Sequence, residues 1–146
     1  MKIAITSDHA GVELKKILKE HIEAKGIEVS DLGPNDKNSV DYPDYAKKLC
    51  EKVINKEADF GIAICGTGVG MSIACNKVKG IRASLCSEPL SAKFTRLHNN
   101  SNVLCLGARV IGDELAKYIV DVYLENDFEG GRHQTRIDKL EEGIDE

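Results

Sequence analysis

Hydrophobic residues in the 146-residue chain fall into short apolar runs that alternate with longer amphipathic stretches. Five of the runs have the length and residue types of β-strands. They span residues 3–6, 27–31, 60–65, 81–85 and 103–106. The third run is apolar at nearly every position, which is typical of a strand in a sheet that helices cover on both faces.

The stretches between these runs carry apolar residues at helical spacing. In the first stretch, Leu14, Ile17, Leu18 and Ile22 share one stripe, and Gly26 is suited to end the helix. On this helix His21 is expected in the core and Lys15 largely outside the stripe. Further helices are expected over residues 42–56, from Pro89 to about residue 97, and over 113–123. The core face of the last one is expected to hold Leu115, Tyr118, Ile119, Val122 and Tyr123.

Strands that alternate with helices indicate a three-layer α/β/α sandwich, a Rossmann-like fold with a five-stranded parallel sheet. The length suits one domain over residues 1–146. In such sheets ligands bind beyond the carboxyl ends of the strands, where the strand order reverses. If the order begins 2-1-3, the loops at residues 7–11 and 65–70 lie side by side there. The pattern alone leaves the order of the last two strands open.

Charge and cysteine content exclude several classes of protein. The formal net charge is -4, and residues 125–146 hold eight acidic side chains against three basic ones, so the rest of the chain is close to neutral. No Lys/Arg-rich run and no long apolar stretch occurs, which argues against a nucleic-acid surface and a membrane span. Five cysteines without a CxxC pair argue against a disulfide framework and a zinc site. We expect a cytoplasmic protein.

The loop that follows the third strand, Cys65 to Gly70, is the most unusual segment. It lacks the lysine of a phosphate-binding P-loop, and Met71 stands where a dinucleotide-binding loop needs its third glycine and where a cysteine phosphatase needs arginine. Backbone N–H groups of such a loop can face an anion, and a helix N-terminus favours a thiolate over a thiol. Cys65 is therefore a candidate base or nucleophile. Alternatively, the glycines form a tight turn and Cys65 is a small core residue.

Other candidate residues have both structural and functional interpretations. Asp8 suits the N-cap of the first helix, and His9 could be an ordinary loop residue. His98 ends a helical pattern, where a cation is favoured by the helix dipole. Arg132 and Arg136 would project from one helix face as a fork for phosphate, or they balance an acidic tail. The remaining cysteines, at positions 50, 75, 86 and 105, lie in apolar contexts and are expected to be structural.

Taken in order along the chain, these segments resemble the type B ribose-5-phosphate isomerases, within the ribose/galactose isomerase family. The matching motifs are Ser7-Asp8-His9-Ala10-Gly11, Asp41-Tyr42-Pro43, Ile64-Cys65-Gly66-Thr67-Gly68-Val69-Gly70, Asn76-Lys77, Gly80-Ile81-Arg82-Ala83, Cys86-Ser87-Glu88-Pro89, His98-Asn99, Asn102-Val103-Leu104, Gly107-Ala108-Arg109 and Glu129-Gly130-Gly131-Arg132-His133. They cover essentially the whole chain.

The resemblance implies an aldose–ketose isomerase that interconverts ribose 5-phosphate and ribulose 5-phosphate through a cis-enediolate, without a metal or organic cofactor. Cys65 would be the base. One branch of the family has a glutamate at the position of Met71 instead, and methionine cannot replace it. The wider family also isomerises allose 6-phosphate and galactose 6-phosphate, so a six-carbon substrate is an alternative.

The resemblance also implies roles for other residues. Thr67 and the N–H groups of the loop would stabilise the developing oxyanion, and His98 would open the sugar ring. The N–H groups would come from Gly66, Gly68, Val69 and Gly70. Asp8, Asn99 and Tyr42 would hold the sugar. The phosphate would be bound by His9, Arg109, Arg132 and Arg136.

Family members are homodimers, sometimes tetramers, in which each active site takes residues from both subunits. On this basis, a helical tail over about residues 126–146 is expected to pack on a neighbouring subunit. Two other classes remain open: a non-catalytic sensor of phosphorylated metabolites, and a thiol hydrolase with Cys65 as nucleophile and His98 as base.

Overall fold

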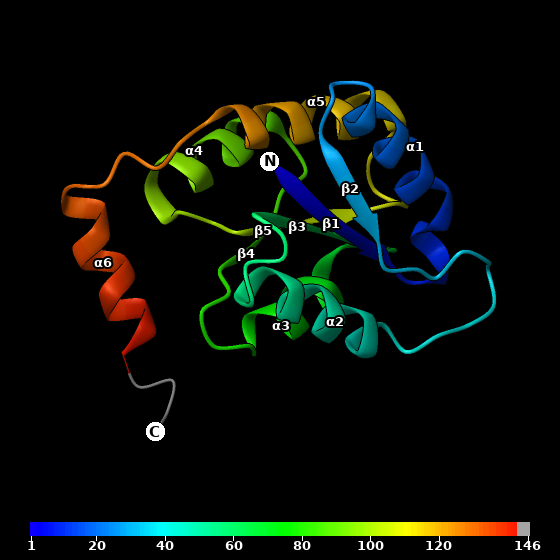
Figure 1. The fold of residues 1–146 in the computed structure, drawn as a ribbon, viewed down its shortest axis with the longest axis horizontal. Helices are drawn as coiled ribbons and strands as arrows, with labels where there is room; N and C mark the ends of the chain where they lie inside the picture. Colours follow the sequence, from blue (N-terminus) through cyan, green and yellow to red (C-terminus); the bar gives the residue numbers. More distant parts are fainter. Residues whose placement is uncertain (143–146) are drawn as a thin grey trace.

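The computed structural model describes residues 1–142 and contains one all-parallel sheet in the order β2-β1-β3-β5-β4 (Figure 1). The strands are β1 (Lys2–Ser7), β2 (Glu28–Asp31), β3 (Phe60–Cys65), β4 (Ala83–Leu85) and β5 (Val103–Gly107). The order begins 2-1-3, as the sequence argument assumed. β5 lies inside the sheet, and the short strand β4 forms its edge.

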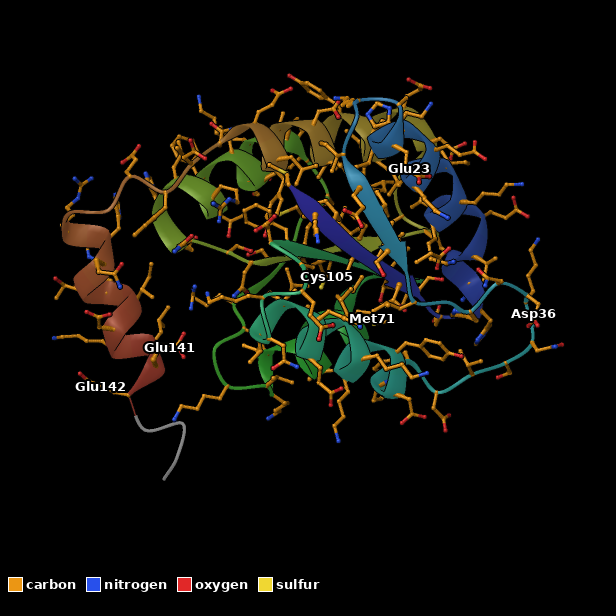
Figure 2. The ribbon with its side chains drawn as sticks, in the orientation of Figure 1. Glu23, Asp36, Met71, Cys105, Glu141 and Glu142 are labelled. Carbon is orange, nitrogen blue, oxygen red and sulfur yellow. The ribbon has the colours of Figure 1, made fainter. Side chains whose placement is uncertain are left out.

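Helices cover both faces of the sheet, which confirms the predicted three-layer single domain (Figure 1). One layer holds α1 (Val12–Glu23), α4 (Pro89–Asn99) and α5 (Asp113–Glu125), and the other holds α2 (Tyr42–Ile54) and α3 (Val69–Asn76). A short 3-10 turn, η1 (His9–Gly11), precedes α1. Because successive strand residues point to opposite faces, Ile3 and Ile5 pack toward α1 while Ala4 packs toward α2. Met71 and Cys105 lie between the sheet and the α2–α3 layer (Figure 2).

The prediction for the core face of α5 was wrong in part. Tyr118 is 57% exposed and Leu115 is 37% exposed, whereas Ala116 and Val120 are fully buried. Ile119 and Tyr123 are buried as expected. The helix carries apolar residues on most of its circumference, so the 3.6-residue period does not decide which stripe faces the sheet.

Two polar residues of α1 also differ from expectation. Lys15 is only 2% exposed, and its Nζ donates to both carboxylate oxygens of Asp31, at 2.7 and 2.8 Å, and to Oδ1 of Asn35. His21 is half-buried rather than part of the core, and its Nε2 lies 2.8 Å from Oδ1 of Asp121 on α5. Both polar groups are tolerated because each has a charged partner.

The C-terminal helix α6 (Arg132–Glu141) stands beside the sandwich, on the side where β1 begins (Figure 1). Only His133 and Ile137 of this helix are buried. Its end is tied to the sheet edge by an ion pair of 2.7 Å between Arg82 and Glu141. Residues 143–146 of the predicted tail lie outside the described residues. No helix within residues 1–142 has the length and apolar character needed to cross a membrane.

Candidate active site

The loop after β3 places the Cys65 sulfur at the start of a helix. Gly68 adopts a left-handed conformation (φ 80°), which turns the chain so that α3 begins at Val69. A side chain at Gly68 would also be blocked, because its Cβ would lie 2.9 Å from the carbonyl carbon of Leu106. The Gly68 N–H donates to Cys65 Sγ at 3.1 Å, and the Val69 N–H donates to Thr67 Oγ1 at 3.3 Å. The Cys65 sulfur therefore accepts an N–H from the turn that leads into α3.

The loop after β1 lies beside this one, as the strand order required. The Asp8 backbone N–H donates to the Ile64 carbonyl at 2.9 Å. Asp8 Oδ1 accepts from the N–H groups of Ala10 and Gly11, so the predicted N-cap is present, on the 3-10 turn that precedes α1. The Val40 N–H donates to His9 Nδ1 at 3.3 Å, which ties the long loop after β2 to the same end of the sheet.

Tyr42 and Arg109 complete the surroundings of the glycine loop. The Tyr42 ring lies against Gly70, where an added Cβ would come within 2.7 Å of the ring carbon Cζ. The Arg109 guanidinium lies over Gly66, 3.3 Å from the position of an added Cβ. The Arg109 N–H also donates to the Gly66 carbonyl at 2.9 Å. A thiol, a phenol and a guanidinium therefore converge on one glycine-rich loop.

The other cysteines differ from Cys65 in their surroundings. They are buried and unpaired, as Cys65 is, but none of them lies in the glycine loop. Burial raises the pKa of the Cys86 thiol to about 11. The pKa of Cys50 is raised further, first by its hydrogen bond with Cys75 and then by burial. The pKa of Cys75 is raised chiefly by its hydrogen bond with Cys105. These thiols are held neutral, which agrees with their predicted structural role.

His98 and Asn99 lie at the opposite end of the sheet from Cys65 within one chain. A helix between two parallel strands runs antiparallel to them, so α4 ends where the strands begin. The Gly61 N–H, at the start of β3, donates to the Asn102 carbonyl at 3.0 Å just beyond that helix end. From Gly61 to Cys65 the strand advances about 13 Å, at about 3.3 Å per residue. One chain alone therefore does not place His98 beside Cys65.

Arg132 and Arg136 lie near His98 and Asn99, away from Cys65. They occupy one exposed face at the start of α6, as their spacing of four predicted. The His98 ring stacks on His133 of α6, with centroids 4.2 Å apart. Glu129 lies beside both rings, with Oε2 3.9 Å from His98 Nε2. Sequence reasoning gave Glu129 and His133 no role, although both belong to the conspicuous segment at residues 129–133.

The residues thus form two groups, one at each end of the sheet, on an α/β sandwich with a cysteine at the start of α3. Comparison with known proteins identifies the class: residues 3–140 match the Ribose/Galactose Isomerase family, and the chain belongs to that family. This confirms the resemblance seen in the sequence.

The individual relatives that resemble the chain are ribose-5-phosphate isomerases B. The chain is 51% identical to ribose-5-phosphate isomerase B of Escherichia coli over 139 residues, which are 95% of this chain and 93% of the relative. The structure of the Clostridium thermocellum ribose-5-phosphate isomerase B superposes with a TM-score of 0.96, at 50% identity over 97% of this chain and 96% of that one. The Mycoplasma genitalium enzyme with bound ribulose 5-phosphate gives a TM-score of 0.94 at 49% identity, over 99% and 97% of the two chains.

Proposed function

We propose that the protein is a cytoplasmic aldose–ketose isomerase that interconverts ribose 5-phosphate and ribulose 5-phosphate. The observation that carries this proposal is the Cys65 sulfur, which accepts a hydrogen bond from the Gly68 N–H where β3 leads into α3. Family membership and the named relatives support the same reaction and substrate.

In this mechanism Cys65 acts as a thiolate base. It removes the proton from C2 of the open-chain aldose. The electrons of that C–H bond form the C1–C2 double bond, and O1 takes the negative charge of a cis-enediolate. Cys65 then returns the proton to C1, and the O2 hydroxyl proton moves to O1 as the C2 carbonyl forms. N–H groups of residues 66–70, with the Thr67 hydroxyl, stabilise the charge on oxygen, and one such donor is typically worth about 3–4 kcal/mol.

Ribose 5-phosphate rests mainly as a furanose, so the ring must open first. His98 gives a proton to the ring oxygen O4 as the C1–O4 bond breaks, and a water molecule takes the O1 proton as the aldehyde forms. Asp8, Asn99 and Tyr42 orient the open-chain hydroxyls. The phosphate is held by a histidine and three arginines, which are His9, Arg109, Arg132 and Arg136. Their combined charge suits a dianion.

The sites are shared between two copies of the chain. Since His98 and Asn99 lie at the opposite end of the sheet from Cys65, only a second copy can bring them to the thiolate. The edge beside β4 favours such pairing because it exposes large apolar side chains from several elements. These are Val69, Ile73, Leu85, Leu90, Phe94 and Leu140. A cavity of about 310 Å³ between this edge and α6 offers room for part of the second copy.

Thiol alkylation tests the function. Iodoacetamide should abolish isomerase activity by modifying Cys65, and ribose 5-phosphate should protect it. The matched control is Cys86, whose burial raises its pKa to about 11 and keeps it a thiol at pH 8. Mass spectrometry during turnover separates an isomerase from a thiol hydrolase, since only the hydrolase forms a covalent intermediate. Retained activity in a protein fully alkylated at Cys65 would refute the cysteine mechanism.

Subunit mixing tests the shared site. Cys65→Ala and His98→Ala chains should each be inactive alone. In a mixed dimer one site loses both residues and the other keeps both. An equal mixture, refolded or co-expressed, should therefore regain about a quarter of the wild-type specific activity, since about half of the dimers are mixed. No recovery despite mixed dimers would show that each site uses one chain only.

Steady-state kinetics on ribose 5-phosphate, allose 6-phosphate and galactose 6-phosphate, measured side by side, test the substrate. We expect the highest kcat/KM for ribose 5-phosphate. A higher value for either six-carbon phosphate would assign the protein to that branch of the family. Sedimentation analysis decides between a dimer and a tetramer.

A further inference from the structure

Glu129 is held beside His98 by the backbone. Its N–H donates to the Leu97 carbonyl at 3.0 Å, in the last turn of α4. Gly130 (φ 72°) and Gly131 (φ 59°) then turn the chain sharply into α6. Positive φ angles are readily adopted only by glycine. The turn brings His133 of α6 under the imidazole of His98, so two segments far apart in the sequence enclose one side chain.

The three side chains contact one another closely. Glu129 Oε2 lies 3.9 Å from His98 Nε2 and 3.5 Å from His133 Nε2. The two imidazole rings are nearly parallel, at 13°, with centroids 4.2 Å apart. His133 is only 5% exposed, and its Nε2 has no hydrogen bond within the described residues. His98 is 35% exposed, so one side of it remains accessible to a ligand.

These are the residue types of a metal site, and they are the only such group among the described residues. The ring geometry does not suit a shared ion. The lone pair of an imidazole nitrogen lies in the ring plane, and two nearly parallel stacked rings direct their lone pairs side by side rather than toward one point. Both nitrogens instead lie within 4 Å of the same oxygen, Oε2 of Glu129.

The environment also favours the neutral form of His133. The pKa of His133 is lowered by its desolvation and then by the neighbouring His98 and Arg132. A neutral His133 can stack on His98 without placing two cations in contact. The negative charge of Glu129 is then left to orient the imidazole of His98.

We propose that Glu129 and His133 are positioning residues that hold His98 in the orientation in which it opens the sugar ring. The carboxylate fixes the Nε2 side of the imidazole, and the stacked ring fixes its plane. The contact between Glu129 Oε2 and His98 Nε2, at 3.9 Å, is longer than a hydrogen bond, and such contacts in ligand-free sites commonly tighten when the substrate binds. This inference rests on the proposed function of His98.

The chemistry of the two substrates supplies a specific test. Ribulose 5-phosphate has its carbonyl at C2 and a phosphate on O5, so it cannot close a furanose ring and needs no ring opening. Ribose 5-phosphate must open its ring before it can react. For an enzyme defective only in ring opening, the forward rate stops rising with enzyme concentration, because spontaneous opening then supplies the substrate. The reverse rate stays proportional to enzyme.

The experiment measures both rates against enzyme concentration for wild type, His98→Ala, Glu129→Gln, His133→Ala and His133→Phe. His98→Ala should reach the forward plateau. For Glu129→Gln and His133→Ala, the part of the forward rate that still rises with enzyme concentration above the spontaneous plateau should be about 10- to 100-fold lower than in wild type. Their reverse rates should stay within about twofold of wild type. His133→Phe, which retains a flat ring, should recover most of the loss. Glu114→Gln, at an exposed acid of α5, is the control and should match wild type.

The outcomes distinguish failure of the role proposed for His98 from failure of the positioning role proposed for Glu129 and His133. If His98→Ala shows no plateau, the role proposed for His98 is wrong. If His98→Ala reaches the plateau while Glu129→Gln and His133→Ala behave as wild type, the positioning role alone is overturned. An equal loss in both directions with a lower melting temperature would also overturn it, since that pattern reports a structural defect.

Discussion

Gly107, at the end of β5, supports the glycine loop without facing the substrate. A Cβ at this position would lie 2.6 Å from the Thr67 carbonyl oxygen and 2.7 Å from its carbonyl carbon. Ordinary contacts begin at 3.4 Å, so Gly107→Ala must displace the Thr67 backbone by roughly 0.8 Å. Gly107 is paired with Cys65 of β3 in the sheet, and the loop is the part that can move.

The displacement predicts a catalytic defect in a folded protein. Overpacking of this kind costs about 1–3 kcal/mol, and the lower entropy of the unfolded chain returns about 0.4–1 kcal/mol. The net loss leaves a typical domain folded. A shift near 1 Å of groups that position a substrate costs about 100-fold in rate. We therefore expect kcat for ribose 5-phosphate to fall by about 30- to 100-fold.

The assay is initial-rate kinetics together with circular dichroism and thermal melting. Gly112→Ala is the matched control because a Cβ there meets nothing within 4 Å. It should keep wild-type kcat, with at most about 1 kcal/mol of stability lost at the N-cap of α5. A folded Gly107→Ala protein with wild-type kcat would refute the idea that the loop must hold its position for catalysis.

Four other substitutions have definite expected results. Cys65→Ala should reduce kcat by at least about 100-fold while calorimetry still detects sugar-phosphate binding; an unchanged kcat would exclude Cys65 as the base. Arg132→Ala and Arg136→Ala should each raise KM for ribose 5-phosphate far more than for unphosphorylated ribose, and equal effects would indicate a structural role. Lys15→Met leaves the carboxylate of Asp31 without its buried partner and should cost about 3 kcal/mol in urea denaturation, and a cost under about 1 kcal/mol would contradict this account.

The sequence sufficed for the strands, though not for the order of the last two, and for the neighbouring positions of two loops, because both depend on local patterns. Apolar runs predicted every strand, and the parallel arrangement placed the loops that contain Asp8 and Cys65 side by side. The hydrogen bond from Asp8 N–H to the Ile64 carbonyl has this origin. Tyr42 and Arg109 came from the family resemblance, since nothing local links them to Gly70 and Gly66.

Other features depend on contacts between distant segments. The stripe of α5 was misassigned because Leu115 and Tyr118 are apolar yet exposed, and only the position of the sheet selects Ala116 and Val120. Lys15 appeared to be a surface residue because Asp31, its partner, follows 16 residues later at the end of β2. The environment of His98 likewise depends on a turn that returns to α4 thirty residues after that helix.

The position of His98 at the opposite end of the sheet from Cys65 has a genetic consequence. In the proposed homodimer, a chain that lacks both residues deprives one site of its base and the other of its acid. Every mixed pair formed with such a chain is inactive, so the defective allele acts dominantly over a normal one in the same cell. In that homodimer the two chains of a pair, rather than each chain alone, determine whether a site works.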